Sequence, residues 1–339
     1  MCTQDKLRYT PIINTHDKTI YENCIKSQPT GNFFQSWDFG VFQETLPYRG
    51  KVWALTHGKS ACLAIKMKLP LGFCWLWVPY GPIGSEKGEL DKVFGDLGKI
   101  AGEEGAIFAR IEPPLDSPAI PLAQKWPITP SGKRFTPEHT LVLDLDKSEQ
   151  EILAQMKPKG RYNINIAKKH GVTCAVFCKF EDIPAQDFNS FYEILQKTAQ
   201  RDTFGIHPKY FYENLLKTLS PQNACALFLA YSGEKVVAGI ITVYYKDTAT
   251  YYFGASNHEY RSLMAPYLLQ WEAICDAKKR GFKHYDFLGI APSEAKNHPW
   301  AGVTDFKKKF GGGEVQYPPA FDIIYRPFLF KLMNVLKRA

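Results

Sequence analysis

The chain has 339 residues, enough for two domains of about 150 residues each. Hydrophobic residues make up 45% and charged residues 22% of it, with no low-complexity tract, which excludes a largely disordered protein. The net charge of +8 favours an anionic partner such as nucleic acid, a nucleotide or an acidic membrane.

The eight cysteines form no Cys-x-x-Cys pair and no Cys/His cluster at zinc spacing. Most of them lie in apolar runs, as buried free thiols do. We therefore expect reduced thiols, no metal and a cytoplasmic protein. The N-terminus lacks an apolar signal core, and no stretch of 18 residues is free of charge, so neither a signal peptide nor a membrane-spanning helix is expected.

In the first half, alternating and apolar runs predict strands, and apolar residues at helical spacing predict one helix. The expected strands are 51–55, 62–68, 73–78 and 106–111, and the helix lies around 90–100. The first two strands form a hairpin, and Pro79-Tyr-Gly-Pro82 ends the third.

The second half repeats this order of hairpin, strand, helix and strand. A helix is expected over 182–201, the hairpin over 226–231 and 236–245, a strand over 250–254, a helix from Pro266 and a strand over 283–288. The repetition predicts two similar α/β domains side by side, with a cleft between them as the usual place for a substrate.

A strand at 141–145 and a helix beginning at a Ser148/Glu151 capping box connect the halves. We place the boundary near residue 147, so that the domains are 1–147 with 314–339 and 148–313. The tail 321–339 has apolar residues interleaved with basic ones. It is expected to be an amphipathic helix packed on the body, with contact to a membrane surface as the alternative.

Three segments carry candidate chemistry. The first is a basic stretch without acids that contains Lys157, Lys159, Arg161, Lys168 and Lys169. On a helix starting near Gly160, Arg161 and Lys168 share a face. Such a cluster can contact phosphates, and a solvated charged face is the alternative.

The second segment runs from Tyr251-Tyr-Phe-Gly-Ala-Ser-Asn257 to a helix opened by Pro266. Free N–H groups at such a helix start attract anions. Acetyltransferases of the GNAT type bind coenzyme A here with a Gln/Arg-x-x-Gly-x-Gly/Ala loop. Arg261 fits that pattern, but Met264 replaces its first glycine and Pro266 removes a donor, which argues against coenzyme A.

The third segment joins Tyr285-Asp-Phe-Leu-Gly-Ile290 to a lysine-rich stretch that ends in Gly311-Gly-Gly313. The glycines allow a close backbone approach or a tight turn. A hairpin with a lysine-rich edge is the alternative.

Together these segments resemble the FemABX family. The likeness is strongest over 148–318 and rests on the basic stretch, Tyr-Gly-Ala-Ser-Asn-type and Ala-Pro-Tyr-Leu-Leu-Gln-Trp motifs, Tyr-Asp-Phe-Leu-Gly-Ile and Phe-Lys-x-x-Phe-Gly-Gly. The resemblance implies two tandem GNAT-like domains with mixed sheets. It implies transfer of Gly, Ala or Ser from aminoacyl-tRNA to the stem-peptide amine of a peptidoglycan precursor, either lipid II or UDP-MurNAc-pentapeptide. There is no room for the coiled-coil arm of some members.

The resemblance also implies site residues. Phe306 and Lys307 match the pair at the family's reaction centre. Glu112 matches an acidic residue that would take the amine proton or only orient the amine. The substrate-binding positions are Gln43, Arg201, His207, Tyr210, Tyr252 and Phe253. The basic stretch with Lys157, Lys159, Arg161, Lys168 and Lys169 is implied to bind the tRNA. At Gln43 and His207 the family's basic residues are missing, with Arg201 as a substitute for the second, so the identity of the precursor is open.

No cofactor is implied, because aminoacyl-tRNA is a co-substrate. Peripheral contact with the inner face of the membrane remains open. The alternatives are an acyl-CoA N-acyltransferase on the same fold, a non-catalytic protein that binds tRNA or envelope precursors, and an aminoacyl-tRNA-dependent enzyme that tags protein N-termini.

Overall fold

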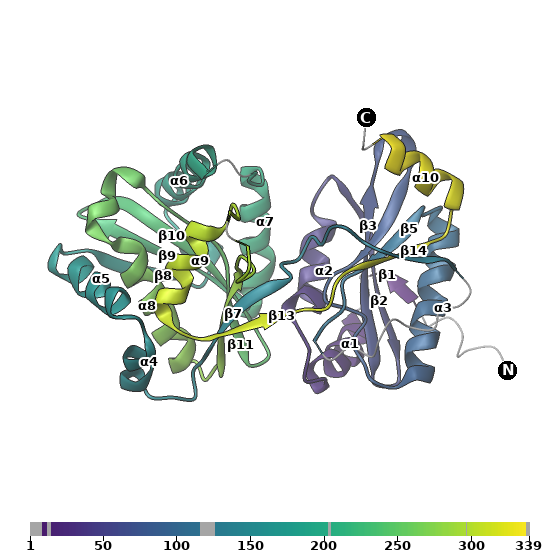
Figure 1. The fold of residues 1–339 in the computed structure, drawn as a ribbon, viewed down its shortest axis with the longest axis horizontal. Coiled ribbons are helices and arrows are strands. Elements are labelled where there is room, and N and C mark those ends of the chain that lie inside the picture. Colours follow the sequence, from purple (N-terminus) through teal and green to yellow (C-terminus); the bar gives the residue numbers. More distant parts are fainter. Residues whose placement is uncertain (1–8, 12–14, 116–125, 203–204, 296, 337–339) are drawn as a thin grey trace. The chain divides into compact units, whose positions relative to one another are not determined.

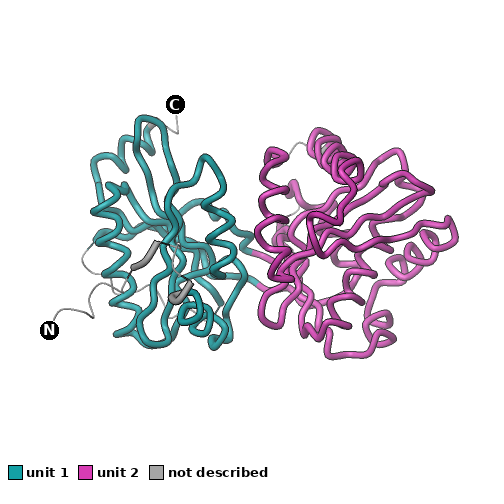
Figure 2. Tube along the Cα trace, turned by 180° about the vertical axis from the view of Figure 1, so that it is seen from behind, with its two compact units in different colours: residues 1–138, 316–339 teal, residues 139–315 magenta. Residues whose placement is uncertain are grey.

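The computed structural model describes residues 9–11, 15–115, 126–202, 205–295 and 297–336. The chain divides into two compact units (Figure 2), unit 1 with residues 1–138 and 316–339 and unit 2 with residues 139–315. The prediction placed the strand around 141–145 before the domain boundary. The structure instead includes it in the sheet of unit 2, so the chain passes between the units just before this strand.

Unit 1 is a seven-stranded sheet with helices packed on it (Figure 1). The strand order is β1-β2-β3-β4-β5-β14-β6, and β4 and β5 pair in parallel. The strands are β1 (Tyr9–Pro11), β2 (Arg49–His57), β3 (Ser60–Lys68), β4 (Cys74–Val78), β5 (Phe108–Ile111), β6 (Ile128–Pro130) and β14 (Phe321–Ile324). The helices are α1 (Thr15–Ser27), α2 (Trp37–Glu44), α3 (Lys87–Glu104) and α10 (Pro327–Leu336), with short 3-10 helices η1 (Phe33–Gln35) and η2 (Pro70–Gly72).

Unit 2 contains a second seven-stranded sheet, in the order β13-β7-β12-β11-β10-β9-β8. The strands are β7 (His139–Asp144), β8 (Thr173–Phe177), β9 (Cys225–Ser232), β10 (Lys235–Tyr245), β11 (Thr248–Ser256), β12 (His284–Gly289) and β13 (Gly313–Gln316). The helices are α4 (Glu149–Gln155), α5 (Pro158–Lys169), α6 (Ala185–Asp202), α7 (Lys209–Leu219), α8 (Ala265–Lys279) and α9 (Ala301–Lys307). The 3-10 helices are η3 (Phe180–Asp182), η4 (Ser220–Gln222), η5 (His258–Leu263) and η6 (Lys308–Phe310).

The predicted repetition is confirmed. In unit 1 the hairpin β2–β3 leads to β4, then through α3 to β5, which pairs with β4 in parallel. In unit 2 the hairpin β9–β10 leads to β11, then through α8 to β12, which pairs with β11 in parallel. The fold class is therefore the expected one, two α/β units with mixed sheets. The predicted cleft between them stays a prediction.

Local signals account for several helix ends. Ser148 caps α4 through the predicted capping box with Glu151. Lys157 then precedes Pro158, which opens α5 two residues earlier than the predicted start. Gly105, at φ 67, ends α3 in the left-handed conformation that glycine adopts most easily.

The seven cysteines in the described part of the chain are free, whereas Cys2 lies outside it. None of the helices in the described ranges is long and apolar enough to span a bilayer.

Candidate functional site

Lys307, the last residue of α9, is buried in unit 2 with 7% of its surface exposed. Its Nζ donates a hydrogen bond to the carbonyl oxygen of Gly289 at 2.7 Å and lies 5.4 Å from the ring centroid of Tyr251. Burial lowers the pKa of Lys307 to about 8, while the nearby charge of Asp286 acts in the opposite direction. Lys307 is therefore a cation near neutral pH that releases its proton far more readily than an exposed lysine does.

Asp286 supplies a buried carboxylate to the same region of unit 2, with 5% of its surface exposed. It accepts hydrogen bonds from the hydroxyl of Thr140 and, at 2.7 Å, from the backbone N–H of Leu288. Burial raises its pKa, and these two hydrogen bonds and the charge of Lys307 counteract the rise. The charge of Asp286 thus favours the protonated form of Lys307 and offsets part of the decrease in its pKa that burial causes.

The end of β12 is distorted where it provides the acceptor for Lys307. Its ladder with β7 shifts register between Asp286 and Gly289, and Leu288 has a left-handed φ of 56°. This conformation costs an L-residue about 1–2 kcal/mol. Backbone strain of this kind concentrates at functional sites, where the surrounding structure holds it in place.

Helix α9 is fixed to this strand end from two sides. The backbone N–H of Ala291 donates to the hydroxyl of Thr304 at 2.8 Å. The ring of Phe306 packs edge-on against Tyr267 of α8, with centroids 5.0 Å apart, and against Phe310, at 5.4 Å. The lysine-rich stretch therefore forms a helix and a 3-10 turn, and the alternative of a hairpin is wrong.

Gly312 allows the segment after Lys307 to lie close to the sheet. Gly312 lies so close to β7 that an added Cβ would be 2.7 Å from the carbonyl oxygen of Val142, and its φ is 93°. A side chain at this position would push the lysine-bearing segment away from the sheet. Gly312 therefore provides the close backbone approach that its sequence suggested.

An aromatic cluster in the same unit contains three of the predicted substrate residues. The ring of His207 stacks on Phe211 at 3.7 Å and meets the edge of Phe253 at 6.0 Å, and Tyr252 packs against Phe253 at 4.2 Å. Phe253 lies two residues after Tyr251 on β11, so this strand connects the cluster with Lys307. Of the other two predicted positions in unit 2, Tyr210 on α7 is 37% exposed and Arg201 is exposed near the end of α6.

Glu112 lies in unit 1 and is fully buried. Its carboxylate accepts hydrogen bonds from the backbone N–H groups of Phe135 and Thr136, at 2.5 and 3.1 Å, and from the Thr136 hydroxyl at 2.7 Å. Such a carboxylate fixes the 135–136 segment to the end of β5.

Gln43 in unit 1 is also buried, and its side chain orients a cation. Its Oε1 accepts a hydrogen bond from Nε of Arg49 at 3.0 Å. The Arg49 guanidinium also lies over the rings of Tyr48 and Trp77, 4.9 and 5.6 Å from their centroids. The positive charge that the sequence lacks at position 43 is thus present six residues later, held by Gln43.

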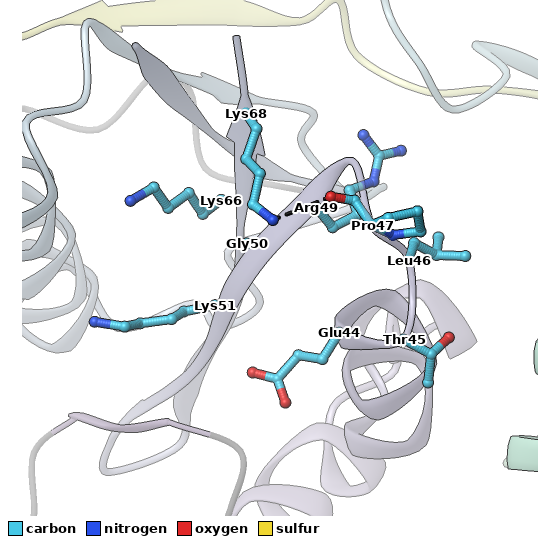
Figure 3. A pocket seen from close by; sticks show the side chains of 9 residues that line it. All are labelled: Glu44, Thr45, Leu46, Pro47, Arg49, Gly50, Lys51, Lys66 and Lys68. Carbon is cyan, nitrogen blue, oxygen red and sulfur yellow. Dashed lines mark hydrogen bonds between the residues drawn. The ribbon is translucent and has the colours of Figure 1, made fainter. Parts of the chain in front are cut away.

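Arg49 borders a basic hollow of about 480 Å³ in unit 1 (Figure 3). Its basic lining also includes Lys51, Lys66 and Lys68, and Glu44 of α2 contributes an acidic side chain. Lys51 and Lys66 both donate to Glu104, at 2.8 and 2.6 Å, and Lys68 donates to the carbonyl oxygen of Pro47 at 3.0 Å.

The basic stretch forms α5, and its members differ in role. Arg161 donates to the carbonyl oxygens of Leu153, Ala154 and Met156, so its guanidinium caps the end of α4. Lys157, Lys159, Lys168 and Lys169 are exposed, and so is the ring of Tyr162, at 64%. The backbone N–H of Lys157 donates to the carbonyl oxygen of Lys309 at 3.0 Å, which ties α5 to the segment that follows Lys307.

The start of α8 differs from a coenzyme A loop. The six-residue turn η5 precedes it, and Met264 has a left-handed φ of 54°. Pro266 lies in the first turn of α8 and lacks an N–H. The structure therefore retains the two features that argued against coenzyme A.

A model of the FemAB family matches residues 128–232 and 222–338, which is more than half of the chain. The chain belongs to the FemAB family. The chain is similar to a lipid II:glycine glycyltransferase from Staphylococcus haemolyticus and to one from Staphylococcus aureus. Each is 19% identical to this chain, and each alignment covers 94% of both proteins.

Solved structures confirm the FemAB-type fold. The crystal structure of FemX superposes with a TM-score of 0.80 at 17% identity, over 93% of this chain and 98% of that one. A tandem GNAT protein from the clavulanic acid biosynthesis pathway superposes with a TM-score of 0.56 at 11% identity, over 93% of this chain and 98% of that one. The two units are therefore GNAT-like.

The sequence of this FemAB-family protein did not point to Arg49, Asp286 or Tyr251 as site residues. Asp286 had a usable signal, since a single carboxylate inside an apolar strand is costly to bury without a partner. Arg49 and Tyr251 had none, because their contacts with Gln43 and Lys307 depend on pairing between distant segments.

Proposed function

We propose that this protein transfers glycine from glycyl-tRNA to the stem-peptide amine of a lipid-linked peptidoglycan precursor. The observation that carries the proposal is Lys307, a buried cation with a pKa of about 8 in a chain of the FemAB family. The names of the aligned staphylococcal relatives support lipid II as acceptor and glycine as donor group. Alanine and serine are the other donors to test.

In the proposed reaction, the amine nitrogen of the precursor attacks the ester carbonyl of the charged tRNA. An N–C bond forms, the C–O bond to the terminal ribose breaks, and the amine proton leaves to a base while the ribose oxygen takes up a proton. Lys307 donates to the oxyanion and to the departing oxygen. Removing one such donor costs about 2.7–4 kcal/mol of transition-state stabilisation in enzymes that use an oxyanion hole.

The local geometry suits Lys307 for this task. One N–H of its ammonium is bound to Gly289, which leaves two further donors for a reacting oxygen. Its pKa of about 8 places proton donation close to neutral pH, where a general acid is most effective. The hydrogen bond to Gly289 and the ring of Tyr251 restrict the motion of the ammonium group, so its remaining donors are preorganised.

Unit 2 is proposed to bind the charged tRNA. The exposed lysines of α5 surround Tyr162, and a basic surface with an exposed aromatic ring is typical of sites where phosphates and unpaired bases bind. The hydrogen bond from Lys157 to Lys309 places α5 next to the lysine-bearing segment. Unit 1 is proposed to bind the precursor, with Arg49 in place of the basic residue missing at Gln43.

The reaction as proposed needs no metal or cofactor, so chelation should leave turnover unchanged. Charged tRNA and a lipid-linked acceptor would meet in the cytoplasm, at the inner face of the membrane. Glu112 has a positioning role in this scheme, through the 135–136 segment that it holds.

A transfer assay tests the proposal. Purified protein is mixed with labelled glycyl-, alanyl- or seryl-tRNA and with lipid II, UDP-MurNAc-pentapeptide or a peptide with a free N-terminus. Label in lipid II from glycyl-tRNA is the expected result. Label in the peptide alone would show that the acceptor is a protein N-terminus and not lipid II. Acylation of an amine panel by acetyl-CoA, without any tRNA-dependent transfer, would show that the protein is an acyl-CoA N-acyltransferase.

A further inference from the structure

One end of unit 1 gathers exposed apolar side chains. The described residues include twelve large hydrophobic side chains that are exposed, and five of them lie on the turn between β3 and β4 or on α10. These five are Leu71 at 93%, Phe73 at 37%, Phe328 at 78%, Leu332 at 47% and Val335 at 64% exposure. We call them the apolar tip.

Backbone hydrogen bonds bring the two segments of the apolar tip to the same end of the sheet. The N–H of Ile107 donates to the carbonyl oxygen of Cys74 at 2.9 Å, directly after Phe73. The N–H of Arg326 donates to the carbonyl oxygen of Ile107 at 3.0 Å, just before α10 begins. Figure 1 shows α10 beside this end of the sheet.

Helix α10 is packed on one side only. Phe330 is buried and its ring meets Phe108 edge-on at 5.3 Å, which holds α10 against the sheet. Phe328, Leu332 and Val335 follow the spacing i, i+4 and i+7, so they form one stripe on another side. The predicted packing of the tail on the body therefore coexists with an exposed apolar face.

The turn between β3 and β4 likewise exposes an apolar side chain, that of Leu71. Leu71 has a left-handed φ of 59°, a conformation that glycine or asparagine adopts at lower cost. The turn thus holds a large apolar side chain in solvent at a position where its backbone conformation is unfavourable for leucine.

Basic residues adjoin both segments of the apolar tip. Lys68 ends β3 directly before the turn that carries Leu71, Arg326 directly precedes α10, and Lys331 is exposed on α10 itself. Neither the turn over 69–73 nor the described part of α10 contains an acidic residue, and the carboxylate of Glu104 at the end of α3 is paired with Lys51 and Lys66. Apolar side chains next to basic ones are typical of surfaces that enter the headgroup region of an anionic bilayer.

We propose that the apolar tip docks this protein onto an anionic lipid bilayer, with Phe328, Leu332 and Leu71 inserted between the headgroups. The excess of basic residues favours lipid over a second copy of the chain, whose like charges would repel across the contact. The purpose of docking rests on the proposed function, since a lipid-linked acceptor lies in a membrane, but the binding itself requires no turnover.

Vesicle flotation tests the proposal, using phosphatidylcholine vesicles with and without phosphatidylglycerol. The wild-type protein should float with the anionic vesicles and lose binding as salt rises. The double variant Phe328→Ser/Leu332→Ser should bind at least about tenfold more weakly, since each lost apolar side chain lowers the partition coefficient several-fold. Lys68→Gln/Lys331→Gln should weaken binding to anionic vesicles alone.

Ile20→Ser is the matched control, because Ile20 is 56% exposed on α1 of the same unit. Tyr21, its neighbour on α1, bonds to Gln35, which itself bonds to the carbonyl oxygen of Pro79 at the opposite end of β4. Ile20→Ser should therefore bind vesicles like the wild type. Equal binding of wild type and the double variant would overturn the proposal, as would a wild-type dimer in sedimentation velocity that the double variant abolishes.

The same experiment remains informative if the transfer reaction fails. Vesicle binding without any aminoacyl transfer would support the docking surface and refute the proposed function. Transfer to lipid II without vesicle binding would support the proposed function and refute the docking surface.

Discussion

Replacing Lys307 with methionine should stabilise the protein at neutral pH while it abolishes turnover. The pKa of Lys307 falls from 10.5 to about 8 on folding. Each pKa unit corresponds to about 1.4 kcal/mol, so the buried ammonium lowers the free energy of unfolding by about 3 kcal/mol. Methionine fills a similar volume without charge, and loss of the hydrogen bond to Gly289 offsets about 1 kcal/mol of the gain. A net gain of about 2 kcal/mol at pH 7 is expected.

The stability difference between the wild type and Lys307→Met should decrease as pH rises. Between the folded pKa and the unfolded pKa, the unfolded chain binds more protons at Lys307 than the native protein does, so the stability of the wild type rises with pH relative to the variant. Below the folded pKa the destabilisation is complete, and it disappears as pH approaches 10.5. The advantage of Lys307→Met should therefore shrink by about 2 kcal/mol between pH 7 and pH 9.5.

Urea denaturation of both proteins at several pH values measures this difference, because all other titrating groups contribute nearly equally to both. Lys169→Met is the control, since Lys169 is exposed on α5 and its replacement should change stability by less than about 0.5 kcal/mol at any of these pH values. A stability difference between wild type and Lys307→Met that does not vary with pH would refute the argument from burial.

Three further predictions follow from contacts in each unit. Glu112→Gln should lower the free energy of unfolding by about 1–3 kcal/mol, because an amide cannot accept all the hydrogen bonds from Phe135 and Thr136; unchanged stability with lost turnover would instead identify Glu112 as the base. Arg161→Met should destabilise α4 by about 1 kcal/mol in thermal unfolding, whereas Lys169→Gln should leave stability unchanged and reduce the salt dependence of tRNA binding in filter assays. Initial transfer rates should fall as pH rises through about 8, where Lys307 loses its proton, and a rate that keeps rising through that range would contradict its role as a cation.

Much of the fold was predictable because its signals are local. The hairpins, the capping box of α4 and the proline that opens α8 depend on a few neighbouring residues. The repeated order of elements then fixed the fold class. The place of β7 was not predictable, because an isolated apolar strand carries no mark of which sheet it will join.

The candidate site was predictable where a motif carries the chemistry. Phe306 and Lys307 stand in such a motif, and the structure places Lys307 in a buried position with a defined acceptor. The environment that tunes Lys307 was not predictable, because it depends on the distorted end of β12 and on Asp286. Tertiary pairing also decides that Arg161 caps a helix while its neighbouring lysines stay exposed.

In the proposed function, this FemAB-family protein uses Lys307 to move glycine from a charged tRNA to a lipid-linked precursor. The most direct measurement is a single-turnover assay with labelled glycyl-tRNA and lipid II, run side by side with the wild type and with Lys307→Met. We predict label in lipid II with the wild type and a rate at least about 100-fold lower with the variant, which stays folded. Equal rates for the two proteins, or no transfer by the wild type with any of the charged tRNAs, would contradict it.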